Sequence, residues 1–195
     1  MDFGKRNFDK ERQRMLKRLA TKIDYDIDTV GHSVMLTQLE LPTHRVSMSY
    51  SIGLSLKGPN DFVILGLPVE YAREVIAQLA RLSETGELSP DFATTYPCED
   101  KSPMCDSAIH QSGIVYRDDV FSGYRCAILP LHGLPQALND IVPWQVYKGR
   151  EISSKFCQVV LPDKNNLFPW EGGENQASCP VLAQVDGMPA SKVLH

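Results

Sequence analysis

An unbroken apolar run followed at once by a proline is the feature that most restricts how this chain of 195 residues folds. The segment from Asp61 to Leu67, which is apolar after its first residue, does not alternate between apolar and polar side chains, and this is typical of a central strand buried on both faces of a sheet. Pro68 suits the first turn of a helix, because its missing N–H has no helical partner there. An apolar stripe at helical spacing then predicts a packed helix over residues 69–82 (Ala72, Val75, Ile76, Leu79 and Ala80).

Further strands are predicted on either side of this unit. Residues 33–41 and 45–52 form a hairpin, and its second arm alternates apolar residues with serines, which places the serine hydroxyls on the outer, solvated face (Val46, Met48, Tyr50 and Ile52 against Ser47, Ser49 and Ser51). Strand-like segments return at residues 114–117, 124–131 and 155–161. The predicted fold class is α+β: a single domain with a mostly antiparallel sheet, one packed helix and a peripheral N-terminal helix.

The first 22 residues are strongly basic. They hold eight Lys or Arg against three acidic residues, a local charge of +5, whereas the remainder of the chain carries −9. A narrow apolar stripe predicts a helix over residues 10–22 that packs on the domain edge or against a partner (Phe8, Met15, Leu16, Leu19 and Ile23). Nucleic-acid binders usually spread basic charge across the domain beside aromatic platforms, so no nucleic-acid partner is expected.

Three parts are predicted along the chain: a basic helical extension over residues 1–27, the α+β domain over residues 28–185, and a loose tail over residues 186–195. Residues 88–113 are rich in Ser, Pro, Asp and Thr, which is typical of a loop insertion. No apolar stretch approaches the roughly 20 residues of a membrane-spanning helix, and the N-terminus has no apolar signal core. We therefore expect a cytoplasmic protein with no membrane partner.

The five cysteines do not suggest a disulfide framework, because their number is odd and their spacing irregular. Cys126 and Cys157 lie in predicted strands, where a thiol behaves as a small buried hydrophobe. Cys98, Cys105 and His110 are the nearest approach to a metal cluster, and zinc is the ion that such ligands hold. The two thiols are seven positions apart, however, whereas structural zinc sites pair ligands two to four residues apart. Free loop thiols are therefore favoured, and no cofactor is predicted.

Short catalytic signatures are absent. The chain has no P-loop, Rossmann glycine pattern, HExxH, GxSxG or CxxC. His32 is a candidate general base, because an unperturbed imidazole titrates near neutral pH, and Asp163 is the second candidate catalytic residue. A structural role competes with catalysis at both positions.

The feature of the sequence that most clearly suggests a functional site is a turn that follows the last predicted strand. Gln158 lies within that strand, Asp163 follows it, and Trp170 comes at the end of Phe168-Pro169-Trp170. The structural interpretation has Asp163 accepting backbone N–H groups of its own turn, and Trp170 capping the core with its indole N–H on a carbonyl. The functional alternative makes Gln158, Asp163 and Trp170 the rim of a binding pocket, with Tyr50 beside it.

Four stretches of the chain resemble a family of bacterial proteins, Domain of Unknown Function 4262. They are Tyr50-Ser51-Ile52-Gly53-Leu54, Phe62 to Pro68, Gln158 to Asp163, and Phe168-Pro169-Trp170, and their order and spacing match over roughly residues 28–184. The chain departs from the family pattern at Val30-Gly31-His32, where His-Gly is usual, and at Gly58-Pro59-Asn60-Asp61, where His-Pro-Glu-Leu is common. The resemblance implies a soluble, single-domain bacterial protein, and it implies no reaction.

Three classes of function stay open. The missing catalytic motifs, the acidic body and the aromatic turn favour a non-catalytic binding module with a protein partner, either an immunity-type inhibitor that neutralises a toxin or a regulatory partner. The first alternative is a small hydrolase or transferase, which would be metal-dependent if residues 98–110 held zinc. The second alternative is a small-ligand sensor with its pocket beside Tyr50 and Trp170.

Overall fold

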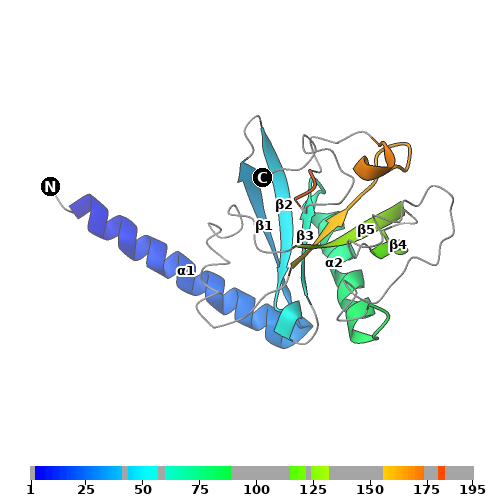
Figure 1. Ribbon diagram of the computed structural model, residues 1–195. Coiled ribbons are helices and arrows are strands. Elements are labelled where there is room, and N and C mark those ends of the chain that lie inside the picture. Colours follow the sequence, from blue (N-terminus) through cyan, green and yellow to red (C-terminus); the bar gives the residue numbers. More distant parts are fainter. Residues whose placement is uncertain are drawn as a thin grey trace.

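The computed structural model describes residues 3–40, 44–56, 60–88, 115–121, 124–131, 156–173 and 180–182 (Figure 1). The helices are α1 (Phe3–Val30) and α2 (Val69–Glu84), with short 3-10 turns η1 (Leu54–Leu56) and η2 (Pro169–Glu171). The strands are β1 (Ser33–Glu40), β2 (Arg45–Ile52), β3 (Asp61–Leu65), β4 (Val115–Phe121), β5 (Tyr124–Leu131) and β6 (Phe156–Val160). They form one sheet in the order β1-β2-β3-β6-β5-β4, in which β3 and β6 are parallel and every other pair is antiparallel. The predicted α+β fold class is confirmed.

The central pair, β3 and β6, is buried at all of its positions. Successive side chains of β3 enter different apolar clusters, because side chains alternate between the two faces of a strand. Phe62 and Ile64 pack with α2, whereas Val63 and Leu65 belong to a cluster on the other face. The continuous apolar run of this segment therefore reflects a strand covered on both sides.

Helix α2 covers the first face. Its predicted apolar stripe is buried and packs against β3, β5 and β6, and Pro68 stands directly before its first residue. Ser49 and Ser51 of β2 lie on this same face and are covered, since their side chains are 1% and 0% exposed. The expectation that these hydroxyls face solvent is therefore wrong for Ser49 and Ser51, whereas Ser47 is half-buried. The alternation of β2 separates two buried faces, one apolar and one lined with hydroxyls, and a pattern of polar residues does not by itself distinguish a solvated face from a covered one.

The second half of α1 covers part of the opposite face. Ile23 is fully buried with β2 and β3 residues, and Leu19 and Ile27 pack beside it. The helix is longer than the predicted segment 10–22, because the aspartates that follow Lys22 do not end it. Lys22 pairs with Asp26 one turn on, and the helix ends only where Gly31 takes a φ of 91°. Its first half projects away from the sheet (Figure 1).

A buried carboxylate ties β2, η1 and β3 together. Asp61 Oδ1 accepts hydrogen bonds from Ser51 Oγ at 2.8 Å and from the Leu54 N–H at 3.1 Å, and its Oδ2 accepts one from Ser55 Oγ at 2.7 Å. Burial raises the pKa of Asp61, and these donors oppose that shift by stabilising the charged form. The same junction includes Gly53, which has a φ of 106° and approaches α1.

Several predicted segments lie outside the described residues. They are most of the insertion over residues 88–113, with Cys98, Cys105 and His110, and the tail over residues 186–195. In the part of the chain that is described, no helix has the length and apolar character needed to cross a membrane.

Gly53 supplies a test of the contact between α1 and the sheet. A Cβ at this position would lie 2.7 Å from Cγ1 of Ile27 and would also need a left-handed backbone. Gly53→Ala should therefore lower the free energy of unfolding by about 2–3 kcal/mol, through strain and overpacking together. Gly86→Ala is the matched control, because Gly86 has a φ of 76° and a methyl group there would meet no heavy atom within 4 Å.

The control should cost only about 1 kcal/mol, from backbone strain. Urea unfolding of both variants measures the difference. Equal losses for Gly53→Ala and Gly86→Ala would contradict a close contact between α1 and Gly53.

Candidate functional site

Tyr50 and Gln158, two of the four predicted binding residues, lie in one row across the sheet. Tyr50 is paired with Val63, Val63 with Gln158, and Gln158 with Leu129, so all four side chains share the face opposite α2. The turn that holds Asp163 and Trp170 folds onto this same face, because Phe168 packs with Leu129 and Val160. The four predicted residues therefore belong to one side of the sheet.

The Gln158 side chain binds a distant piece of backbone. Its Nε2 donates to the carbonyl oxygen of Pro180 at 2.7 Å, and its Oε1 accepts the N–H of Leu182 at 2.7 Å. Gln158 is 1% exposed, and Val181, between the two anchored residues, is fully buried. Both ends of the amide are thus occupied in holding residues 180–182 over the sheet.

Tyr50 is a core residue. It is 1% exposed within an apolar cluster that includes Ile23 of α1, and its hydroxyl has no hydrogen-bond partner among the described residues. Burial raises the pKa of the Tyr50 phenol above its ordinary value, which keeps the side chain neutral. The structure therefore brings Tyr50 near Gln158 on one face, with an unsatisfied hydroxyl and no charge.

Asp163 organises its own turn, as the sequence predicts. Its Oδ1 accepts the N–H of Asn165 at 2.8 Å and that of Leu167 at 3.0 Å. Asn166, between these two, has a φ of 62°, a left-handed conformation that asparagine tolerates better than most residues. The carboxylate thus fixes the loop that brings Phe168 back onto the sheet.

The aromatic residues after this loop form a stacked layer. Phe168 is fully buried and lies parallel to the Trp170 ring at a centroid distance of 5.0 Å, while Trp170 itself is half-buried. The indole Nε1 donates to the hydroxyl of Tyr116 at 2.9 Å. The prediction that the Trp170 indole donates to a carbonyl is wrong. Its partner is the phenol of Tyr116, a residue of β4, which lies beyond β5 in the sheet.

The Arg125 side chain also contacts this aromatic layer. The Arg125 guanidinium carbon lies 5.0 Å from the centre of the Phe168 ring, and its Nη2 donates to Glu171 Oε1 at 2.9 Å. Glu171 Oε2 accepts the N–H of Phe168 at 3.0 Å. Arginine, carboxylate and ring therefore stabilise one another.

The two candidate catalytic residues are not brought together. His32 directly precedes β1 and Asp163 follows β6, and β1 runs parallel to β6 because two antiparallel pairings and one parallel pairing separate them. The start of β1 and the end of β6 lie at opposite ends of the sheet. Burial lowers the pKa of His32, and the carboxylates of Glu84 and Asp26 oppose that shift.

The described cysteines are unreactive. Cys126 and Cys157 are buried in the cluster under α2, which confirms the prediction for both. Burial raises the pKa of Cys126 to about 12 and raises that of Cys157 as well, so neither forms a thiolate near neutral pH. Among the described residues no group of three His, Cys, Asp or Glu side chains is placed to hold a metal ion.

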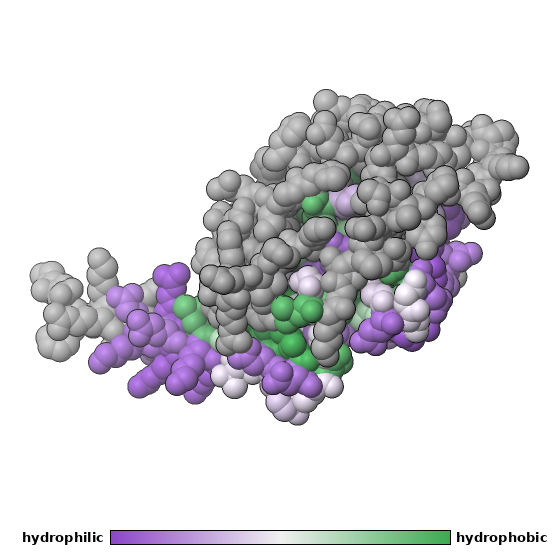
Figure 2. Space-filling view, turned by 60° about the horizontal axis from the view of Figure 1, so that its bottom comes forward, coloured by the Kyte–Doolittle hydropathy of each residue, from purple (hydrophilic) through white to green (hydrophobic). Residues whose placement is uncertain are grey.

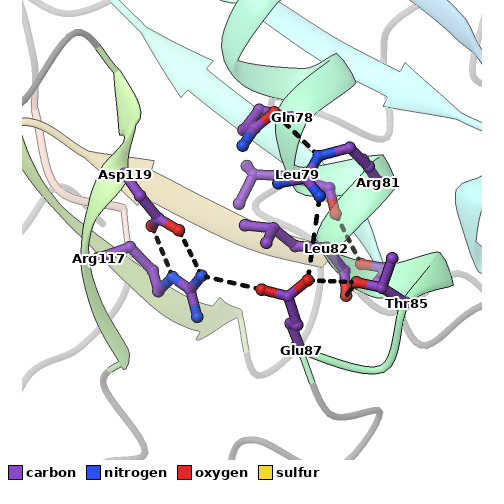
Figure 3. Close-up of polar contacts among 9 residues, drawn as sticks. Gln78, Leu79, Arg81, Leu82, Thr85, Glu87, Arg117 and Asp119 are labelled. Atoms are coloured by element: carbon purple, nitrogen blue, oxygen red, sulfur yellow. Dashed lines mark hydrogen bonds and ion pairs between the residues drawn. The ribbon is translucent and has the colours of Figure 1, made fainter.

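Sequence reasoning missed one polar network, which joins the end of α2 to β4 (Figure 3). Arg117 makes two hydrogen bonds to Asp119, at 2.8 and 2.6 Å, and its Nη2 lies 3.9 Å from Glu87. Glu87 also accepts a hydrogen bond from Thr85 and lies 3.9 Å from Arg81. Asp119 raises the pKa of Arg117, and Arg117 lowers that of Asp119. The only signal in the sequence is the spacing of Arg117 and Asp119, two apart on one strand face.

Comparison with known proteins identifies the family. The profile of the family described as Domain of unknown function (DUF4262) matches residues 26–175, which is more than half of the chain, and the protein therefore belongs to that family. The resemblance seen in the sequence is confirmed. The matched range begins at Asp26 and so contains the end of α1, while the basic half of that helix lies before it. No curated protein and no solved structure matches the chain.

Replacing Gln158 tests its structural role. Gln158→Leu leaves the carbonyl of Pro180 and the N–H of Leu182 without their partner, so the free energy of unfolding should fall by about 3 kcal/mol. Gln78→Leu is the control, since Gln78 is a half-buried glutamine of α2 whose side chain accepts one long hydrogen bond, of 3.3 Å, from Arg81. Its cost should stay within about 0.5 kcal/mol. Chemical denaturation measures both, and equal costs would show that Gln158 does not anchor residues 180–182.

The lowered pKa of His32 predicts a pH dependence of stability. The unfolded chain binds a proton at the ordinary pKa of about 6.5, whereas the folded protein keeps His32 neutral to a lower pH. Lowering the pH through about 6.5 therefore protonates the unfolded state first, and the free energy of unfolding falls. His32→Gln should flatten this dependence between about pH 7 and pH 5. A wild-type protein whose stability changes with pH as the variant's does would contradict the assignment.

Proposed function

We propose that this protein is a non-catalytic protein-binding module and that the basic first half of α1 is its docking element. One observation carries the proposal: this half projects from the body, and between Asp9 and Arg18 every side chain is exposed except the half-buried Leu16 (Figure 1). Figure 2 shows hydrophilic side chains gathered along it. A stretch of helix without packing gains little stability from propensity alone, so it is best explained by a partner that covers it.

The charge and shape of this segment point to the chemistry of the partner. The first 22 residues carry a charge of +5, and Met15, 56% exposed, continues the apolar stripe that Leu19 and Ile23 begin on the sheet. A helix with an apolar edge and basic flanks suits an acidic protein surface, which it would contact through side chains three and four positions apart.

The contacts, positions and burial of the candidate catalytic residues support a binding role over an enzymatic one. Asp163 uses its carboxylate in its own turn, His32 lies at the other end of the sheet, and the two described thiols are buried. Gln158 and Trp170 are engaged in holding the fold. A regulatory partner or an immunity-type inhibitor needs no reactive group, so this arrangement is what we expect of such a protein.

We also propose a bacterial source and a cytoplasmic location. The family resemblance supports the first. The free thiols of Cys126 and Cys157 support the second, because thiols persist in a reducing compartment.

Affinity capture from a lysate of the source organism, followed by binding measurements on each purified prey, tests this proposal. Arg12→Glu/Arg14→Glu should weaken binding of the prey by at least about tenfold, since four charge units change on the docking element. Arg45→Glu/Arg73→Glu makes the same change of net charge at exposed positions of the body and should leave binding intact.

Equal binding of a prey to both double variants would contradict the assignment of α1 as the docking element. A thermal-shift screen against metabolites and divalent metals tests the other classes of function. A sharp shift with a metabolite would favour a ligand sensor or an enzyme, and a shift with a stoichiometric metal would favour the metal-dependent hydrolase or transferase.

A further inference from the structure

We propose that the partner adds an extended, acidic segment to the outer edge of β1, as a seventh strand that the first half of α1 covers on one side. This inference rests on the proposed function, in which that half of α1 is the docking element, and it names what the element holds. Strand addition joins two proteins through main-chain hydrogen bonds, and side chains at alternate positions of the added strand supply specificity.

The outer edge of β1 offers a row of backbone groups to an added strand. Among the described strands, β1 stands at one end of the sheet and pairs only with β2. The N–H of Gly66 donates to the carbonyl oxygen of Ser47 at 2.8 Å, so the backbone groups of Ser47 face β3 and those of its neighbours in β2 face β1. Thr37 pairs with one of these neighbours, so its backbone groups face β2, whereas those of Leu36 and Gln38 point outward.

The two edges of the described sheet differ in their protection against strand addition. Charged residues and bulges are common devices that protect an edge. β4 has both: Arg117, Asp118 and Asp119 follow one another, and its register with β5 shifts between Arg117 and Phe121. β1 has eight residues in unbroken register with β2, and its last residue, Glu40, is its only charged one. The edge of β1 is therefore the one suited to accept a strand.

Leu36 marks where the added strand makes an apolar contact. It pairs with Ser49, so its side chain lies on the same face of the sheet as α2, and it is 52% exposed. A leucine exposed at the centre of an edge strand gains burial from an apolar side chain at the adjacent position of a neighbouring strand. The added segment should therefore carry an apolar residue beside Leu36.

Helix α1 projects past this same edge. β1 is the end strand on the side toward which the first half of the helix extends (Figure 1). Leu19 packs against the cluster that contains Leu39 of β1. Leu16 and Arg12 follow about one and two turns toward the N-terminus, on the side of the helix that Ile23 turns to the sheet. A seventh strand would lie about 4.8 Å beyond β1, on the side of the helix that carries these two side chains.

The charge of the first half of α1 favours an acidic segment. The first 22 residues carry a charge of +5, and Arg12 is exposed, whereas Leu16 is half-buried. A carboxylate on the α1 side of the added strand would pair with Arg12, and an apolar residue two positions away, on the same face of the strand, would contact Leu16. Asp9, the acidic residue on this side of the helix, is about one turn further from the sheet.

A phage-displayed library of random twelve-residue peptides is the probe, panned against the full chain at about 150 mM salt, where long-range attraction is screened. Selected peptides should be acidic, with apolar residues at alternate positions. The strongest is then synthesised with an N-methyl group on one residue at a time. Methylation should weaken binding at least about tenfold at every second position and much less between them, because successive N–H groups of a strand point toward and away from its neighbour. A peptide bound as a helix, or by charge alone, would not give a period of two.

Variants of β1 test where the peptide binds. Gln38→Pro removes an outward N–H and should weaken binding at least about tenfold, whereas Gln38→Thr, the matched control, keeps the N–H and should bind as the wild type does. Leu36→Gln tests the same edge without a proline and should weaken binding about threefold or more, through loss of the apolar contact. Thermal melting checks that each variant folds.

Variants of α1 test the cover. Arg12→Glu should weaken binding of the peptide at least about fivefold, because it places a like charge beside the acidic strand. Arg14→Glu is the matched control: Arg14 is exposed in the same half of the helix but lies on the side opposite Ile23, so it should have a much smaller effect.

A library that yields no peptide, binding without a period of two, or full binding by Gln38→Pro would overturn the added strand. If captured partners still depended on Arg12 and Arg14, the proposed function would stand without it. A period of two with no effect of Arg12→Glu would instead contradict the docking role of α1. Sedimentation velocity tests the other occupant of the edge: a wild type that dimerises, with a dimer that Gln38→Pro abolishes, would show that a second copy pairs with β1 and would overturn the foreign strand.

Discussion

The burial of the central strands on both faces is the constraint on which the rest of this structure depends. β3 and β6 place apolar side chains on each side of the sheet, so each side needs a cover. Helix α2 follows β3 directly and covers one side with a single amphipathic stripe. The other side is covered by pieces that are distant in sequence: the second half of α1, the Phe168 layer and residues 180–182. Each of these pieces requires its own attachment.

The buried polar side chains of the sheet provide much of that attachment. Gln158 holds residues 180–182, Asp163 shapes the loop that returns Phe168 to the sheet, and Asp61 joins β2 to β3. A buried polar group is costly unless it is hydrogen-bonded. The hydrogen bonds that satisfy these side chains also hold the attached segments in place. Residues that stand out in the sequence as candidates for binding thus have a physical reason to be there without a ligand. Among the described residues, the exceptions are the hydroxyls of Tyr50 and Ser49 and the Nδ1 atom of His32, which have no hydrogen-bond partner.

Local periodicity explains which elements could be predicted from the sequence. The run Asp61 to Leu67, the stripe of α2 and the hairpin of β1 and β2 each depend on neighbouring residues, and the structure confirms them. The role of Asp163 also follows from its own turn. Contacts between distant segments could not be predicted in this way: the covered serines of β2, the phenol partner of Trp170, and the network around Glu87 all depend on which strands become neighbours. The predicted extent of α1, residues 10–22, is too short, because the helix continues beyond Lys22 to Val30.

The account divides α1 into a half that belongs to the fold and a half that is presented to a partner. Hydrogen exchange of its backbone amides, in dilute protein at high salt where partners are absent, measures this division directly. Amides from Leu19 to Val30 should exchange as slowly as those of β3, because their opening requires loss of the contacts around Ile23. Amides before Leu16 should exchange orders of magnitude faster, since no described packing protects them. Uniform protection along the whole helix, or equally fast exchange of both halves, would contradict the account.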